Sequence, residues 1–196
     1  MKLEKMSMKS NSDSSKAMKV YQIIYADPPW QYNDRKGNDP AMGGITYQTM
    51  PTTDICQLPV IDIADSNCAL FLWVTMPMLP DGLQVIKSWG FEYVTCGFTW
   101  VKQNKSGMGI YSGLGHWTNG NAELCLLARR GRIVRLNKDV KQIVLSPLHE
   151  HSAKPIEVRE RIIRLLGDLP RIELFARQKV DSWDCWGNEV ESDVSL

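Results

Sequence analysis

The chain has 196 residues, the usual size of one domain and long enough for a hydrophobic core that needs no disulfides. Its 23 Lys and Arg are balanced by 22 Asp and Glu, so overall charge does not indicate a nucleic-acid-binding protein, and any basic surface must be local. Five widely spaced cysteines and three histidines fit neither a disulfide framework nor a zinc site, which predicts a reducing cytoplasm and no metal.

The ends of the chain are predicted to lie outside the folded domain. Residues 1–17 are rich in Lys, Ser, Asn and Met, which predicts a disordered lead. Residues 18–190 are predicted to form a single domain, and residues 191–196 a short polar tail. No apolar run approaches the ~20 residues of a membrane span and no signal peptide is visible, so we expect no membrane association.

A buried strand is predicted at 20–25, where the residues are apolar, β-branched or aromatic. Asp27-Pro28-Pro29-Trp30 follows it directly, at the strand end where open α/β sheets bind ligands. The Asp27 carboxylate and a carbonyl of the turn can accept N–H groups of an exocyclic amine, and neither proline has an N–H that competes. Trp30 offers a stacking face for a base. The structural alternative is an ordinary turn after a strand.

The middle of the chain alternates between helix and strand patterns. After a polar loop at 31–45, the predicted elements are a helix at 52–64, a strand at 68–74, a helix at 78–89 and a strand at 93–101. The candidate caps of the first helix are Thr52, Thr53 and Asp54. The second helix has an apolar stripe, expected to pack against the sheet, formed by Leu79, Leu83, Ile86 and Trp89, with Gly90 at its end.

A glycine-rich loop is predicted at 103–121, which holds five of the fourteen glycines but no complete phosphate-binding motif. We expect it to be a mobile, substrate-facing loop. Strands follow at 123–129 and 141–145, joined by a basic connection that is either a solvated face or a surface for a phosphate backbone.

The clearest helix is predicted at 155–167, with Pro155 at its first position and Gly167 at its end. Its buried side is expected to be Ile156, Ile162, Ile163, Leu165 and Leu166, with Arg159, Arg161 and Arg164 mostly facing out. A strand at 171–176 follows. Strands alternating with helices predict an α/β sandwich with a mainly parallel sheet and antiparallel pairing late in the sheet.

Several separated segments resemble one family, in the same order along the chain. They are Asp-Pro-Pro-Trp at 27–30, Tyr-Gln-Thr-Met at 47–50, Phe-Leu-Trp-Val at 71–74, Gly-His-Trp at 115–117 with Glu123 after it, Lys154-Pro155, Glu-Leu-Phe-Ala-Arg at 173–177, and Trp-Asp-x-Trp-Gly-Asn-Glu at 183–189. On these segments the chain resembles the N6-adenine methyltransferases that include the catalytic subunit of the eukaryotic messenger-RNA adenosine methylation complex. It looks closest to their small bacterial and phage members.

The resemblance implies an α/β, Rossmann-like methyltransferase sandwich that depends on S-adenosylmethionine, permuted so that the catalytic motif precedes the cofactor-binding half. It implies methyl transfer to the N6 amine of adenine, with catalytic residues Asp27, Pro28, Pro29 and Trp30 and substrate-binding residues Tyr47, His116 and Trp117. The implied cofactor-binding residues are Asp27, Lys154, Glu173, Phe175, Arg177, Asn188 and Glu189.

Some of these roles have alternatives. Glu173 fits a salt bridge as well as a cofactor contact, and Phe175 by itself is typical of a core residue. After Arg177 the chain has Gln178-Lys179-Val180 where the eukaryotic catalytic subunit has a His-Asn pair, which leaves the ribose contacts there open. An upstream acidic segment that helps to hold the cofactor's adenine in larger members is expected to be missing or replaced by residues 1–17.

The identity of the substrate is less constrained than the reaction. Bacterial and phage relatives of this size favour DNA, and the eukaryotic branch leaves RNA as the alternative. Methylation of cytosine or of a protein glutamine is a rival within enzymes, because Asn-Pro-Pro-Tyr motifs serve those reactions. A catalytically silent nucleic-acid-binding partner is a rival of another class. A homodimer or a partner subunit is expected to help grip the nucleic acid.

Overall fold

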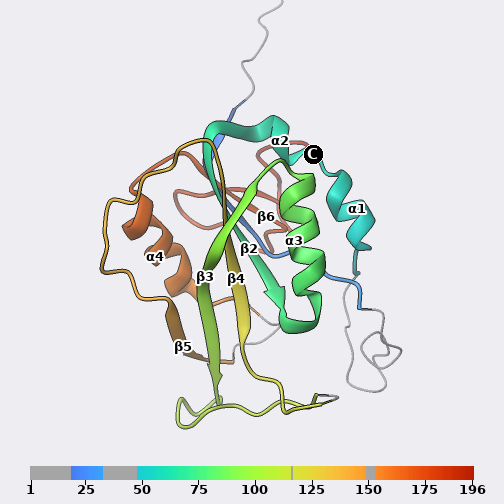
Figure 1. Ribbon diagram of the computed structural model, residues 1–196, viewed down its shortest axis with the longest axis vertical. Helices are drawn as coiled ribbons and strands as arrows, with labels where there is room; N and C mark the ends of the chain where they lie inside the picture. The colour runs from blue at the N-terminus through green and yellow to red at the C-terminus, as the bar shows by residue number, and fades with distance from the viewer. Residues whose placement is uncertain (1–18, 33–47, 116, 149–152) are drawn as a thin grey trace, which may run out of the picture.

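A mixed sheet crosses the molecule in the order β5-β3-β4-β2-β1-β6-β7 (Figure 1). The protein is represented by a computed structural model that describes residues 19–32, 48–115, 117–148 and 153–196. Within these residues the strands are β1 (Tyr21–Ala26), β2 (Ala64–Thr75), β3 (Glu92–Gln103), β4 (Glu123–Arg130), β5 (Ile143–Pro147), β6 (Arg171–Leu174) and β7 (Asp184–Trp186). β4 is antiparallel to β2 and β3, and all other neighbouring strands are parallel. The α/β fold is confirmed, with its antiparallel strand fourth along the chain.

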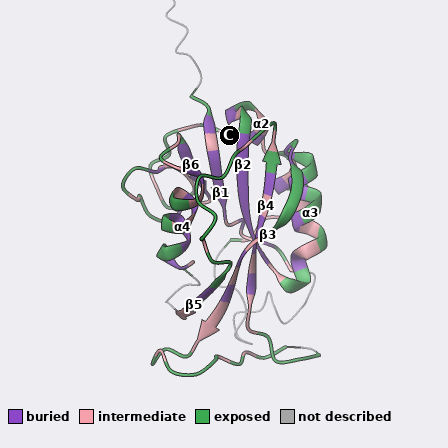
Figure 2. Ribbon diagram, turned by 60° about the vertical axis from the view of Figure 1, so that its left-hand side comes forward, coloured by how far each residue is buried: buried purple, intermediate pink, exposed green. Residues whose placement is uncertain are grey.

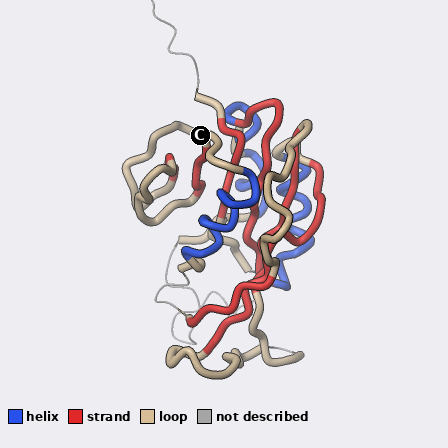
Figure 3. Tube along the Cα trace, turned by 90° about the vertical axis from the view of Figure 1, so that its left-hand side faces the viewer, coloured by secondary structure: helices blue, strands red, loops and turns tan. Residues whose placement is uncertain are grey.

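Helices cover both faces of this sheet. They are α1 (Thr52–Gln57), α2 (Val60–Ile63), α3 (Leu79–Ser88) and α4 (Ile156–Leu166), with a short 3-10 helix, η2 (Met76–Met78), before α3. α1 and α3 lie to one side of the sheet and α4 to the other (Figure 1). Seen from the side, the connection between β3 and β4 extends beyond the sheet (Figure 3).

The central strands are buried on both faces, as Figure 2 shows along β1, β2 and β4. Successive strand residues point to opposite faces, so Ile24 and Leu72 pack towards α1 and α3, whereas Tyr25 and Trp73 pack in the cluster that contains α4. The charged residues at the strand ends also lie on the face that α4 covers, so this face is the one that matters for function.

The predicted helix at 52–64 is two helices, and its expected caps are wrong. Leu58, with ψ of 130°, ends α1, because the residue before a proline avoids helical backbone angles and Pro59 has no N–H to donate. Neither short helix has a side-chain cap; instead, the Thr52 hydroxyl donates a 2.7 Å hydrogen bond to Asp81 on α3.

The predicted apolar stripe on α3 is confirmed at Ile86 and Trp89, which are buried, but is wrong at Leu83. Leu83 is 38% exposed, whereas Gly82 and Val85 are buried against the sheet. A Cβ at position 82 would lie 2.4 Å from the Val74 side chain, so the absence of a side chain at Gly82 lets the helix approach β2 closely. The predicted end of the helix at Gly90, with φ of 79°, is confirmed.

The predicted buried side of α4 is confirmed at Ile162 and Leu166 but wrong at Ile156 and Arg159. Ile156 is 66% exposed, whereas Val158, Arg159 and Ile162 are buried. The Arg159 Nε and Nη2 atoms each donate a 2.7 Å hydrogen bond to a Glu173 oxygen on β6. The helical period places 158, 159 and 162 on one face, and a charged side chain can share that face when it is paired.

β6 is shorter than predicted and β7 was not predicted. β6 ends at Leu174, because Phe175 has φ of 62°, outside the strand region. β7 has only three residues, Asp184–Trp186, too few for a recognisable alternating pattern.

Candidate active site

The carboxyl ends of β1, β2 and β6 meet at one edge of the sheet, where antiparallel β4 begins. A cavity of about 170 Å³ lies at this edge. It is lined by the whole tetrad Asp27-Pro28-Pro29-Trp30 and by side chains that include Tyr32, Trp73, Glu123, Lys154 and Arg177. The sheet thus brings together the predicted catalytic motif and two of the predicted cofactor residues, Lys154 and Arg177.

A chain of alternating charges runs through the cavity. The Lys154 Nζ atom lies 2.8 Å from Asp27 Oδ2 and 3.2 Å from Glu123 Oε2. The other Glu123 oxygen, Oε1, lies 2.5 Å from Lys102 Nζ. The side chains of Lys154 and Glu123 are 10% and 9% exposed, and that of Asp27 is 28% exposed. Asp27 is therefore the most accessible of these three groups.

The pKa values of these groups shift for different reasons. Burial raises the pKa of the Asp27 carboxyl above its ordinary value, although the Lys154 ammonium opposes the rise. Burial acts in the same direction on Glu123, but Lys154 and Lys102 outweigh it and lower the pKa of Glu123. Burial works against the charge of Lys154, yet the two carboxylates raise the pKa of Lys154 overall. Asp27 is thus the carboxyl that takes up a proton first as the pH falls.

Asp27-Pro28-Pro29-Trp30 forms a tight turn that is hydrogen-bonded to neighbouring segments. The Trp30 N–H donates to the Pro28 carbonyl at 2.9 Å, and the Met50 N–H donates to the Pro29 carbonyl at 2.8 Å. Trp30 is 4% exposed, and its Nε1–H donates a 3.0 Å hydrogen bond to the Trp73 carbonyl. Trp30 is therefore almost wholly buried, and this hydrogen bond fixes the orientation of its ring.

The predicted cofactor half is assembled next to the cavity. The Ala176 N–H donates to the Trp186 carbonyl at 2.9 Å, and a Cβ on Gly187 would lie 2.3 Å from the Ala176 oxygen. This close approach places Arg177 near Glu189, with 3.8 Å between Nε and Oε1. Asn188 and Glu189 are exposed there.

Two of the predicted cofactor residues have other contacts. Glu173 has both oxygens bonded to Arg159, which is the salt-bridge alternative. The Phe175 ring packs edge-on against Trp186, with 5.3 Å between centroids, and it lies against the core. Neither residue lines the cavity.

Of the three predicted substrate residues, the structure describes only Trp117, which lies away from the cavity. Trp117 is 98% exposed on the connection between β3 and β4, and it does not line the cavity. Tyr47 and His116 lie outside the described residues. The predicted mobility of the glycine-rich loop stays a prediction.

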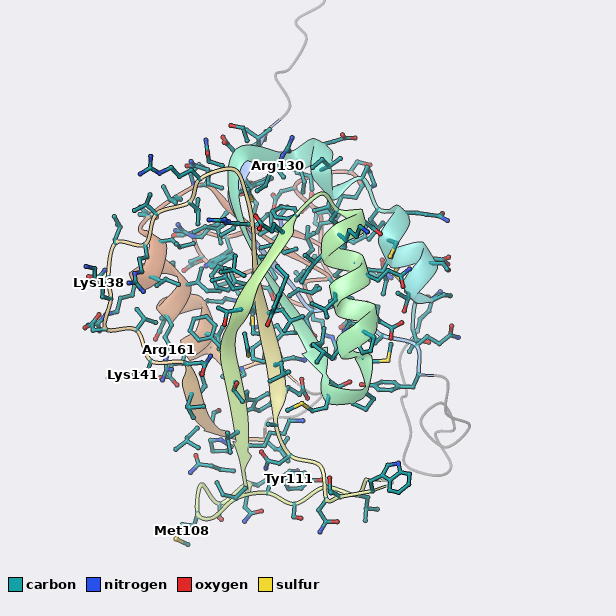
Figure 4. The ribbon with its side chains drawn as sticks, viewed as in Figure 1. Met108, Tyr111, Arg130, Lys138, Lys141 and Arg161 are labelled. Atoms are coloured by element: carbon teal, nitrogen blue, oxygen red, sulfur yellow. The ribbon has the colours of Figure 1, made fainter. Side chains whose placement is uncertain are left out.

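The basic connection after β4 lies away from the cavity. Arg130 is at the opposite end of β4 from Glu123, and its guanidinium donates to the carbonyls of Ile61 and Ala64 (Figure 4). Lys138 and Lys141 lie on the flank of the molecule that carries Arg161 of α4 (Figure 4). Of the two alternatives for this segment, its position favours a solvated face.

Glu123, Lys102 and Trp73 are residues of the site to which the sequence assigned no role, although Glu123 and Trp73 lie in segments that carry the family resemblance. Alternation along β3 places Lys102 on the same face as Trp100, and this signal was available in the sequence. In the described parts of the chain, no group of three or more metal-ligating side chains is close enough to hold a metal ion. No helix among the described residues has the length and apolar character to cross a bilayer.

Comparisons with known proteins find similar methyltransferases. The MT-A70 family model matches residues 21–189. A type II methyltransferase, M.MunI, from Mycoplasma sp is 32% identical over 190 residues, which cover 88% of this chain and 78% of that protein. The N(6)-adenosine-methyltransferase catalytic subunit METTL3 of Homo sapiens is 29% identical over 175 residues, 87% of this chain but only 28% of that protein. The MT-A70-like N(6)-adenosine-methyltransferase of Drosophila melanogaster is 30% identical over 87% of this chain and 27% of its own length.

Proposed function

The chain belongs to the MT-A70 family, and from this premise we propose that it methylates the N6 amine of adenine in DNA, with S-adenosylmethionine as methyl donor. The observation that carries the proposal is the accessible Asp27 carboxylate, which is held against Lys154 and lines the same cavity as the Pro28, Pro29 and Trp30 turn. The names of the relatives, a type II methyltransferase and N(6)-adenosine-methyltransferases, support the reaction class.

The residues around the cavity fit the proposed cofactor. Lys154 and Arg177 are cations suited to a carboxylate or to ribose hydroxyls, and the exposed Asn188 lies in the segment next to Arg177. When bound, S-adenosylmethionine supplies a methyl group from its sulfonium, so that a nitrogen–carbon bond forms, a carbon–sulfur bond breaks and the amine gives up one proton. The cavity of about 170 Å³ is smaller than the roughly 300–1,000 Å³ of typical ligand pockets, so residues outside it, such as the exposed Asn188 and Glu189, would hold part of the cofactor.

Asp27 is the residue that acts on the adenine. The amine of adenine is a weak nucleophile because its lone pair is delocalised into the ring. Asp27 accepts a hydrogen bond from this amine. The bond becomes stronger as positive charge grows on the nitrogen, so it stabilises the transition state more than the ground state. The rigid turn at Pro28 and Pro29 holds the carboxylate in one place, so positioning supplies much of the rate.

DNA is proposed as the polymer because the chain matches a bacterial relative over 78% of that protein's length. In a duplex, the adenine must leave the base stack at a cost of a few kcal/mol, and stacking on tryptophan or tyrosine offsets part of this cost. The test is mass spectrometry of DNA and RNA from cells that express the protein, beside cells that express Asp27→Ala. We expect N6-methyladenine in DNA from the parent only; N6-methyladenosine confined to RNA supports the alternative polymer.

Methyl transfer is expected to fail at acid pH. Only the ionised Asp27 carboxylate accepts the amine hydrogen, and burial raises its pKa, so activity is present above the raised pKa and lost as the pH falls through it. The acid limb of kcat/KM should therefore have its midpoint above the ~3.9 of an ordinary aspartate. An acid limb at or below that value in the folded enzyme contradicts this assignment.

Replacing Lys154 by methionine is expected to weaken the binding of S-adenosylmethionine roughly 10- to 100-fold, the usual loss for a charge-assisted hydrogen bond. Isothermal titration measures the dissociation constant, with Lys141→Met on the flank of the molecule as the control. Asn188→Ala should also weaken binding. Unchanged affinity in both the Lys154 and Asn188 variants removes the proposed cofactor site.

The rival functions make different predictions. A silent partner subunit should show no binding of S-adenosylmethionine in the same titration, whereas an intact Asp27 and Trp30 argue for an active enzyme. Methylation of cytosine or of a protein glutamine should appear in the mass spectra as a different product. The cytoplasmic location and the homodimer or partner subunit stay predictions.

A further inference from the structure

Trp73, near the carboxyl end of β2, contacts three parts of the candidate site at once. The Lys154 Nζ atom lies over its ring, 5.6 Å from the ring centroid. Its Nε1–H donates a 2.6 Å hydrogen bond to the Tyr25 hydroxyl, and its carbonyl accepts the Trp30 Nε1–H at 3.0 Å. Trp73 is fully buried, so these contacts are shielded from water.

The ring of Trp73 is held in one orientation by its neighbours. Tyr25 lies two residues before Asp27 in the chain, and its ring is covered by the Arg159 guanidinium at 5.5 Å. The Trp100 ring packs edge-on against Trp73, with 6.5 Å between centroids. If Trp73 turned, its N–H would lose its buried partner, which is unfavourable.

We propose that Trp73 is a positioning residue that keeps the Lys154 ammonium between the carboxylates of Asp27 and Glu123. A lysine ammonium is a point charge on a flexible stem, so the two carboxylates alone leave its direction loosely defined. An aromatic face adds attraction without an acceptor that competes for the N–H donors. Of the three N–H groups of Lys154, the two carboxylates take two, and the described residues provide no third hydrogen-bond acceptor.

This inference deepens the proposed methyl transfer and rests on it only for the role of Lys154 in cofactor binding. The geometry itself is testable in the free protein, because the charged groups that act on Asp27 are Lys154, Glu123, Arg177 and Arg159, with the neutral Cys125 thiol buried nearby. Among these, the three cations favour the ionised carboxylate and Glu123 disfavours it. A displaced Lys154 therefore raises the pKa of Asp27, whether or not the protein transfers methyl groups.

The test is a titration of the Asp27 carboxyl carbon by NMR in the free protein, comparing the parent, Trp73→Leu and Lys154→Met. We expect Trp73→Leu to shift the Asp27 midpoint upward, in the direction of Lys154→Met but less far. The matched control is Phe71→Leu, which removes a fully buried ring from the same strand and the same face, where it stacks on Phe98 rather than on Lys154. This control should lose stability without moving the midpoint.

A second readout is the dissociation constant of S-adenosylmethionine, which should rise roughly three- to tenfold in Trp73→Leu and stay unchanged in Phe71→Leu. The inference is overturned if Trp73→Leu and Phe71→Leu titrate at the same pH as the parent. If Trp73→Leu fails to fold, Trp73→Phe and Tyr25→Phe take its place. Each of these variants removes the hydrogen bond between the Trp73 indole N–H and the Tyr25 hydroxyl. An unshifted Asp27 midpoint in both variants overturns the inference. An upward shift without methyl transfer in the parent leaves the positioning role standing and removes only the proposed function.

Discussion

Asp27→Ala is expected to lower methyl transfer to adenine by roughly 100- to 1,000-fold, the usual loss when one preorganised hydrogen-bonding group is removed from a reacting centre. The Asp27 side chain is 28% exposed, which makes it a more accessible acceptor than the Glu123 carboxylate. The Pro28 carbonyl is a weaker candidate, because it already accepts the Trp30 N–H. The measurement is the rate of tritium transfer from labelled S-adenosylmethionine to DNA and, in parallel, to RNA at saturating cofactor.

The comparison needs a control for the loss of a carboxylate in general. Asp65→Ala serves this purpose, because Asp65 lies at the beginning of β2, at the opposite end of the strand from Thr75 and the cavity. That variant should keep the parental rate. If Asp27→Ala retains a rate within tenfold of the parent, Asp27 does not orient the amine, and the proposed mechanism is wrong.

Arg159→Met is expected to lower the free energy of unfolding by about 3–5 kcal/mol, the usual cost of breaking a buried ion pair from one side. The Arg159 and Glu173 side chains are 9% and 11% exposed, and two hydrogen bonds of 2.7 Å join them. Without the guanidinium, the Glu173 carboxylate stays buried beside Tyr25 without its partner. Urea unfolding followed by circular dichroism measures the change.

The size of this effect depends on burial, which two further variants check. Arg164→Met, on the same helix, removes an arginine that is 62% exposed and paired with Asp139, and it should cost at most about 1 kcal/mol. The double variant Arg159→Met/Glu173→Met should recover much of the stability, because replacing a whole buried pair by apolar side chains is often neutral. If Arg159→Met alone is as stable as Arg164→Met, the buried pair does not stabilise the fold.

Much of the fold could be predicted from local patterns. Strands that are buried on both faces contain continuous apolar runs, which is why β1 and β2 were found near their observed positions. The helical period, Pro155 and Gly167 predicted the bounds of α4 to within one residue at each end, but the same period did not reveal that Arg159 faces the core. Sequence patterns rank a charged residue as exposed, and only its partner, 14 positions away, makes burial favourable.

The candidate site, like the fold, could be predicted only in part from local sequence patterns. The sequence by itself determined that Asp27, Pro28, Pro29 and Trp30 follow a buried strand, because a turn-forming motif after an apolar run is local information. Only the tertiary structure decided that Lys154, 127 positions later, meets Asp27, and that Lys102, Glu123 and Trp73 join them. These side-chain contacts depend on the order of the strands in the sheet and on the direction of β4. Long-range electrostatic and packing contacts of this kind leave no periodic signal in the sequence.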